Sequence, residues 1–180
     1  VTGFIEKPSP GESPTNWINA GTYVLEPSVL KQIPINQRVS VEKETFPTLA
    51  AESQLFAFQS ETYWIDTGTP ATYLQAQIDL LEGGVRGNSH NGLDPTSLIN
   101  GEVSESVVGA DVVIEKGARI ERSVILKGAK IEQGAIVSNS IIGFDSCIGQ
   151  NAAIRSLSVI GHRVQVPNGI ELNGMTMAES

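Results

Sequence analysis

Aliphatic residues recur about every six positions along the second half of the chain. The positions are Val108, Ile114 and Ile120, then Ile125, Ile131 and Val137, then Ile142, Ile148 and Ile154, then Ile160, Val166 and Leu172. A period of six fits neither one helix nor a lone strand, but it fits a coil of three short strands whose inward side chains stack between turns. The pattern therefore predicts a parallel β-helix of about four coils over residues 103 to 172.

A second repeat gives the length of each coil. Ser106, Ser123, Ser140 and Ser158 each precede two β-branched residues, at intervals of 17, 17 and 18 residues. Gly, Ala and Asn occupy the intervening turns, where small side chains or a positive φ are wanted. Each coil buries its aliphatic residues only against its neighbours, so the ends of the rod need other elements or a partner chain to cover them.

The first half of the chain alternates two kinds of pattern. Residues 2–6, 18–25, 55–60 and 63–65 are β-rich runs, whereas residues 26–33, 40–51 and 69–82 are helical, the second with Ser40 as N-cap and a bend at Pro47. Three prolines between residues 8 and 14 predict a loop. The strands are too few for a complete sheet, so we expect about half of an α/β domain over residues 1–87, a linker over 88–97 and the β-helix with its tail over 98–180. A chain that opens inside a strand pattern also leads us to expect a fragment.

Charge and composition exclude several classes of binding partner. The net charge is -8, so the basic footprint that binds nucleic acid or an anionic membrane is missing. The single cysteine, Cys147, excludes an internal disulfide framework, and we expect it to be a small core residue. No apolar run approaches the roughly 20 residues of a spanning helix. We therefore expect a cytoplasmic protein that binds neither nucleic acid nor membrane.

Four short motifs precede the repeats in a fixed order. They are Phe4-Ile5-Glu6-Lys7-Pro8, Asn19-Ala20-Gly21, the run from Ser40 to Pro47, and Trp64-Ile65-Asp66-Thr67-Gly68. Together with the repeats, they resemble the C-terminal part of a sugar-phosphate nucleotidyltransferase, most closely the mannose-1-phosphate guanylyltransferases. The resemblance implies a partial Rossmann-like domain followed by a left-handed parallel β-helix. It also implies synthesis of a GDP-mannose-like nucleotide sugar and pyrophosphate from a nucleoside triphosphate and a sugar 1-phosphate.

The resemblance also implies roles for five residues. Glu6 resembles the carboxylate that accepts sugar hydroxyls, and Lys7 resembles the ammonium group that meets the sugar phosphate. Asn19 resembles the amide that binds the sugar, and Gly21 leaves room for the ligand. Asp66 resembles a carboxylate ligand of Mg²⁺. Each also has a structural interpretation: a solvated strand end for the Glu-Lys pair, a plain turn for Asn19, and an Asx turn before the Pro70 helix for Asp66.

The run Glu42-Lys43-Glu44 is expected chiefly to cap and solvate a helix. The Gly-rich loop that cradles the triphosphate in the resembling family has no counterpart in the chain. We therefore expect the 180-residue polypeptide alone to be inactive.

Two further hypotheses remain open. Many hexapeptide-repeat proteins are acyltransferases that use a histidine base, for which only His90 and His162 are candidates. Alternatively, the β-helix is a non-catalytic module that assembles subunits or regulates the first domain, and a rod with open ends leads us to expect a homo-oligomer.

Overall fold

The computed structural model describes residues 1–3, 5, 9, 11–13, 15–83 and 92–178. It contains two compact units, Val1–Trp64 and Ile65–Ser180. Within the described residues, no helix is both long and apolar enough to cross a membrane.

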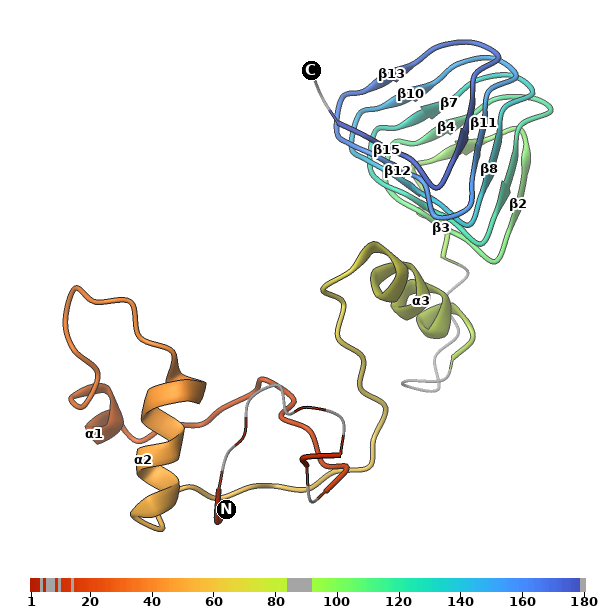
Figure 1. The fold of residues 1–180 in the computed structure, drawn as a ribbon. Coiled ribbons are helices and arrows are strands. Elements are labelled where there is room, and N and C mark those ends of the chain that lie inside the picture. Colours follow the sequence, from red (N-terminus) through yellow and green to blue (C-terminus); the bar gives the residue numbers. More distant parts are fainter. Residues whose placement is uncertain (4, 6–8, 10, 14, 84–91, 179–180) are drawn as a thin grey trace. The chain divides into compact units, whose positions relative to one another are not determined.

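The second unit is dominated by a three-sided parallel β-solenoid (Figure 1). Sheet I contains β1 (Leu98–Ile99), β4 (Val113–Ile114), β7 (Lys130–Ile131), β10 (Cys147–Ile148) and β13 (Gln165–Val166). Sheet II contains β2 (Glu102–Ser104), β5 (Arg119–Glu121), β8 (Ile136–Ser138), β11 (Ala153–Arg155) and β14 (Glu171–Asn173). Sheet III contains β3 (Val107–Val108), β6 (Val124–Ile125), β9 (Ile141–Ile142), β12 (Val159–Ile160) and β15 (Thr176–Met177). The hexad repeat thus folds as predicted.

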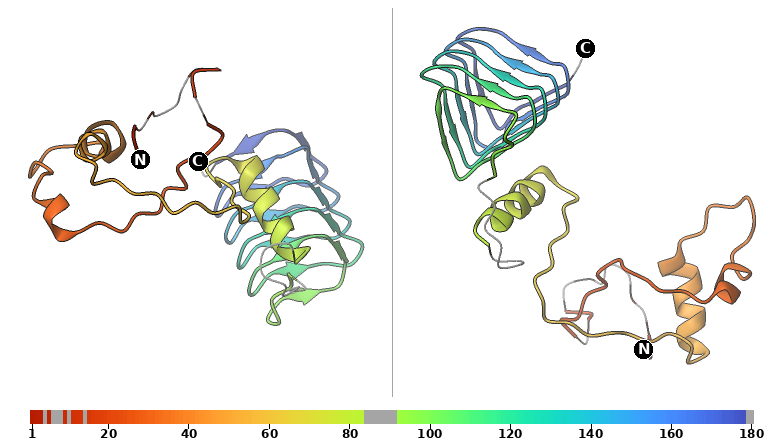
Figure 2. Two further views of the ribbon diagram at one scale, coloured as in Figure 1. Left: turned by 90° about the horizontal axis from the view of Figure 1, so that it is seen from below. Right: turned by 180° about the vertical axis from the view of Figure 1, so that it is seen from behind.

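The inward residues of each sheet stack in register. On sheet I, for example, Ile114 pairs with Ile131, which pairs with Ile148. The twelve predicted positions all lie on these rows, and most of them are fully buried. The core is therefore a set of aliphatic columns. They run along the axis on which the successive turns of the ribbon are stacked (Figure 2).

The solenoid has five turns, one more than the sequence predicted. The additional turn is divided between the two ends: Ile99 on β1 continues the column of Ile114, Val103 on β2 continues that of Ile120, and Met177 on β15 continues that of Ile160. It escaped the period because Val103 follows Ile99 after four residues, whereas Ile120 follows Ile114 after six. Gly101 makes the tight corner, since a Cβ there would lie 2.5 Å from the carbonyl oxygen of Ala118.

The serines of the second repeat form a buried column of hydrogen bonds. The Ser106 hydroxyl accepts from the Ser123 amide at 3.0 Å, and the Ser123 hydroxyl accepts from the Ser140 amide at 3.1 Å. Each hydroxyl also donates to a carbonyl two residues earlier in its own turn. The buried hydroxyls of Ser106 and Ser123 are therefore satisfied as both donor and acceptor, as a low-dielectric interior requires.

Cys147 is not a core residue, contrary to expectation. It is half-buried on the outer side of β10, while its neighbour Ile148 points inward. Successive side chains of a strand point to opposite faces, so the ladder position of Ile148 places Cys147 outside.

Helix α3 (Pro70–Leu81) precedes the solenoid and packs on it (Figure 1). As predicted, Thr69 caps the helix and Pro70 opens it. The Thr69 hydroxyl accepts from the Thr72 amide, and the Thr72 hydroxyl accepts from the Thr69 amide, both at 3.2 Å. The helix ends before Gly83, whose φ of 75° suits a glycine terminus.

The first unit contains α1 (Pro27–Leu30), the π-helical turn η1 (Val41–Thr45) and α2 (Phe46–Ala51). Its core is Val29, Phe46 and Leu49. The predicted helix over 40–51 is present, and the Ser40 hydroxyl accepts from the Lys43 amide as an N-cap. Pro47 cannot donate a backbone hydrogen bond, and the change from π to α geometry falls just before it.

The strands predicted over 2–6, 18–25, 55–60 and 63–65 are absent from their described residues. A β-rich run becomes a strand only when a neighbour supplies hydrogen bonds, and the pattern of one run cannot specify that neighbour. Val24 and Phe58 are 100% and 96% exposed, so these segments carry the apolar side chains of sheet strands without a sheet.

Candidate functional site

The segment 19–21 forms a tight polar turn in the first unit. The Asn19 side-chain oxygen accepts from the Gly21 amide at 3.0 Å, an Asx turn, and Gly21 has a φ of 71°. A Cβ on Gly21 would meet no atom within 4 Å. Gly21 is thus required by its conformation, and the space above it is open to a ligand.

Three side chains meet beside this turn. The Asn19 amide nitrogen donates to Glu42 Oε1 at 2.8 Å and to the Tyr23 hydroxyl at 2.5 Å. The Tyr23 hydroxyl donates to the same Glu42 oxygen at 2.9 Å. We call Asn19, Tyr23 and Glu42 the polar triad. It joins an extended segment to the π-helical turn, residues that the sequence separates by about twenty positions.

Aromatic packing fixes the triad from one side. The Tyr23 ring meets Phe46 edge to face, with centroids 4.8 Å apart. Burial raises the pKa of Tyr23, the Asn19 hydrogen bond opposes this, and the Glu42 carboxylate raises the pKa further. The Trp64 indole donates to the carbonyl of Ala20 at 3.3 Å, which ties the fourth motif to the second. Tyr23 is therefore a neutral hydroxyl at physiological pH.

Sequence reasoning did not find the roles of Tyr23 and Glu42. Glu44 caps the helix as expected, accepting from the Ser40 amide at 3.1 Å, whereas Glu42 turns to Asn19 and Tyr23. The contact escaped the sequence because Glu42 lies about twenty positions from Asn19 and Tyr23.

Asp66 belongs to the second unit, three residues before the cap of α3. It is exposed, and its Oδ1 accepts from the Gly68 amide at 2.9 Å. The Asx turn considered as the structural interpretation is therefore present. Asn19 and Gly21 come together in the first unit, while Glu6 and Lys7 lie outside the described residues.

The fit of a divalent metal can be tested on these residues. No group of three or more His, Cys, Asp or Glu side chains among the described residues could enclose a metal ion. Mg²⁺ in phosphate-transfer sites is commonly held by one or two carboxylates together with substrate phosphates. An exposed carboxylate such as Asp66, whose Oδ1 is oriented by a backbone amide, fits that arrangement as one ligand.

His162 is held in a role that does not suit an acyltransferase base. Its Nδ1 accepts from the Phe144 amide at 3.0 Å, and its ring stacks on Phe144 with centroids 4.8 Å apart. The Nδ1 lone pair therefore faces a backbone amide of the solenoid and is not directed at a substrate. His90, the other candidate, lies outside the described residues.

An Asn-Ala-Gly turn and an Asp66 loop, followed by a parallel β-solenoid, are the features expected of a sugar-phosphate nucleotidyltransferase with a hexapeptide-repeat domain. Residues 1–83 match the nucleotidyl transferase family model, and residues 86–179 match that of the GMPPB C-terminal domain. The chain belongs to the mannose-1-phosphate guanylyltransferase-like family of nucleotidyltransferases.

Curated relatives agree with these matches. "Probable mannose-1-phosphate guanylyltransferase 2" of Oryza sativa subsp. japonica is 37% identical over 191 residues, which cover 97% of this chain and 52% of the relative. The mannose-1-phosphate guanyltransferase of Candida albicans is 37% identical over 189 residues, covering 97% of this chain and 51% of the relative. The chain thus spans about half the length of the curated relatives that it matches.

Proposed function

We propose that this chain supplies the sugar-phosphate side of an enzyme that makes a GDP-mannose-like nucleotide sugar. In this reaction an oxygen of the sugar 1-phosphate attacks the α-phosphorus of the nucleoside triphosphate. The bond from that phosphorus to the β-phosphate bridging oxygen breaks, and pyrophosphate leaves. No protein nucleophile takes part, so the residues act by positioning and by neutralising charge.

The polar triad is the observation that carries this proposal. A sugar presents several hydroxyls, each a donor and an acceptor, and the triad offers an amide, a phenol and a carboxylate beside open space at Gly21. A hollow of about 490 Å³ in the same unit is lined by Val1, Thr2, Gly3, Ile5, Ser13, Thr15, Trp17 and Gln59. Its size is in the range of small-molecule sites.

The charged groups would act on both the sugar and the phosphate of the substrate. Lys7 would meet the sugar phosphate as a compact charge, and Glu6 would accept sugar hydroxyls. Asp66 would hold Mg²⁺, which when bound neutralises phosphate oxygens. The isolated 180-residue chain would bind a sugar phosphate and would not turn it over, because no Gly-rich triphosphate loop occurs in its sequence.

The test is a titration of the chain with mannose 1-phosphate, in which heteronuclear NMR monitors the backbone amides. We expect shifts of the Asn19 and Gly21 amides in the wild type. Asn19→Ala should weaken binding by about tenfold, the order of one or two lost hydrogen bonds. Gln32→Ala, an exposed polar residue outside the triad, is the matched control and should bind as the wild type does.

Two outcomes would overturn the proposal. Equal affinity of Asn19→Ala and Gln32→Ala would remove the triad from the sugar site. Synthesis of a nucleotide sugar by the purified 180-residue chain would contradict its inactivity.

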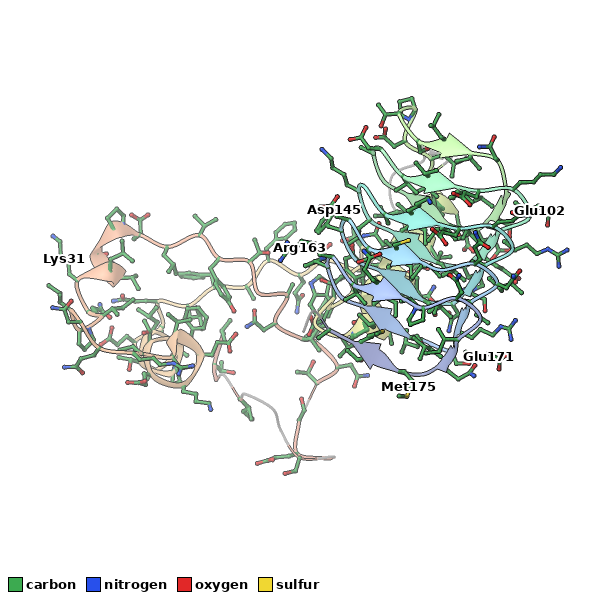
Figure 3. All side chains as sticks on the ribbon, turned by 90° about the horizontal axis from the view of Figure 1, so that it is seen from above. Lys31, Glu102, Asp145, Arg163, Glu171 and Met175 are labelled. Carbon is green, nitrogen blue, oxygen red and sulfur yellow. The ribbon has the colours of Figure 1, made fainter. Side chains whose placement is uncertain are left out.

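We also propose that the solenoid assembles subunits. Its last strands, β13, β14 and β15, each pair on one side only, and Met175 in the last turn is 53% exposed (Figure 3). Unpaired parallel edges beside an apolar side chain favour association with another chain. Sedimentation equilibrium should give a mass above 19.2 kDa, whereas a monomer at high concentration would contradict this role.

A further inference from the structure

We propose that the solenoid fixes the position of Asp66 through α3, with Val124, Ile141 and Leu157 as positioning residues. The inference rests on the proposed role of Asp66 as a metal ligand. All of these residues belong to the unit Ile65–Ser180.

The outer face of sheet III is the first observation. Its outward row is Val107, Val124, Ile141 and Val159, aliphatic in four successive turns. The corresponding row of sheet I contains Val113, Lys130, Cys147 and Gln165, and sheet II exposes Arg119 and Glu121. An aliphatic outer row does nothing for the internal columns of the solenoid, so it serves an element packed outside.

That element is α3. Leu74 and Ile78, four residues apart on one helix face, are buried in one cluster with Val124 and Ile141. Tyr73 and Leu81 extend the same contact. The helix is thereby attached along its length to the solenoid.

The C-terminal end of α3 is held by a close approach of backbone. A Cβ at Gly92 would lie 2.5 Å from a Leu81 methyl carbon and 2.6 Å from the carbonyl oxygen of Ser106. The Gly92 carbonyl in turn accepts from the Val108 amide at 2.7 Å. Only glycine allows Leu81 this contact with the first turns of the solenoid.

Leu157 is a strained residue that faces the same cluster. The repeat interval is 18 rather than 17 residues in this turn, and Ser156 and Leu157 both have positive φ, 59° and 64°. Left-handed backbone is unfavourable for a bulky side chain and persists only when surrounding contacts require it. Leu157 packs against the cluster that contains Leu74 and Ile78, so this turn adds one more apolar side chain to the seat of the helix.

The other end of α3 leads directly to Asp66. Gly68, whose amide donates to Asp66, immediately precedes the cap Thr69, and the Thr69–Thr72 capping box fixes the first turn of the helix. Only a few freely rotating backbone torsions therefore separate the Asp66 carboxylate from α3, which packs on the solenoid. Displacements of about 1 Å are enough to matter in a catalytic site.

Amide hydrogen exchange on the 180-residue chain tests the coupling without any substrate. In Val124→Ser we expect the Gly68 and Thr72 amides to exchange at least tenfold faster, because the helix loses part of its seat. Val113→Ser makes the same change on the outer row of sheet I and should leave both amides unchanged. Val124→Ile, which copies the residue of the next turn at Ile141, should restore wild-type exchange.

A second variant separates positioning from damage to the solenoid. Leu157→Gly removes the side chain from the cluster and also relieves the strained backbone. It should accelerate exchange at Gly68 while leaving the Ile131 amide protected. Unchanged exchange at Gly68 in both Val124→Ser and Leu157→Gly would overturn the inference. An equally large acceleration in the control Val113→Ser would overturn it as well.

Paramagnetic Mn²⁺ separates this inference from the proposed function. In the wild type, Mn²⁺ should broaden the Gly68 amide signal, and Asp66→Asn should abolish the broadening. Persistence of the broadening in Asp66→Asn would refute the metal role and leave the exchange result standing. Loss of broadening at a fixed Mn²⁺ concentration in Val124→Ser, with recovery in Val124→Ile, is the result expected if the solenoid positions the carboxylate.

Discussion

The two units of the chain treat their apolar residues in opposite ways. In Ile65–Ser180, the aliphatic columns close on themselves, and Ile114, Ile131 and Ile148 have no exposed surface. In Val1–Trp64, a small cluster around Phe46 is buried, whereas Val24, Phe56 and Phe58 are 84 to 100% exposed. In a repeat, each turn packs against the next turn in the sequence. In an α/β segment, a strand pairs with distant strands that its local pattern does not specify.

Stability should therefore be concentrated in the solenoid. Ile131→Ala in the central turn removes most of a fully buried side chain and leaves a cavity that the paired turns cannot fill. We expect the free energy of unfolding to fall by about 3 kcal/mol. Phe58→Ala removes a larger side chain that is 96% exposed, and we expect a change within about 0.5 kcal/mol. Urea unfolding followed by circular dichroism measures both. A loss for Phe58→Ala as large as that for Ile131→Ala would break the contrast between the units.

The serine column offers a finer test of the solenoid. Ser123→Ala leaves the Ser140 amide without its acceptor in a buried position and should cost about 1 to 3 kcal/mol. Ser104→Ala, an exposed serine on β2, should be nearly neutral. The same urea experiment compares them. Equal stability of the two variants would show that the buried column contributes nothing beyond its shape.

How much the sequence could predict follows the same division. The aliphatic columns were predicted position by position because their contacts repeat at a fixed interval, and only Ile99 and Val103 at the start and Met177 at the end were missed. The caps at Ser40 and Thr69 were predicted because they depend on residues three or four positions apart.

The candidate site was only partly predictable. Asn19 and Gly21 were identified through a motif, and the structure confirms that they share one turn. Glu42 was assigned to helix solvation because its partners lie about twenty residues away, and no local pattern encodes that contact. The strand predictions failed for the same reason. Hydrogen bonds between distant segments determine both the contacts of Glu42 and the formation of strands.

Cys147 reports on the solenoid alone, since the first unit contains no cysteine. Burial raises the pKa of the Cys147 thiol, and the Glu132 carboxylate, with its Oε1 3.7 Å from the sulfur, raises it further. Because the thiolate is the nucleophile, we expect iodoacetamide to alkylate Cys147 more slowly at pH 8 than it alkylates free cysteine. Glu132→Gln should accelerate the reaction modestly, and urea should bring it to the rate of the free thiol. Fast alkylation of the native chain would contradict the packing of this face.

Tyr23 gives the corresponding probe of the first unit, with the smallest expected effect. Its pKa in the folded chain is raised above the usual 10.0, first by burial and then by Glu42. The folded state therefore holds the proton over a pH range in which the unfolded state has lost it. The resulting stabilisation is complete below about pH 10 and is lost as the pH rises through the folded pKa.

Absorbance at 295 nm, with Tyr23→Phe to assign the signal, should show one phenol that ionises late. Glu42→Gln should lower the pKa of Tyr23 by removing a nearby negative charge, whereas Glu61→Gln, an exposed control, should not. If Tyr23 ionises at its ordinary pH in the wild type, the polar triad does not persist in solution. The first unit would then differ from the solenoid in local order as well as in burial.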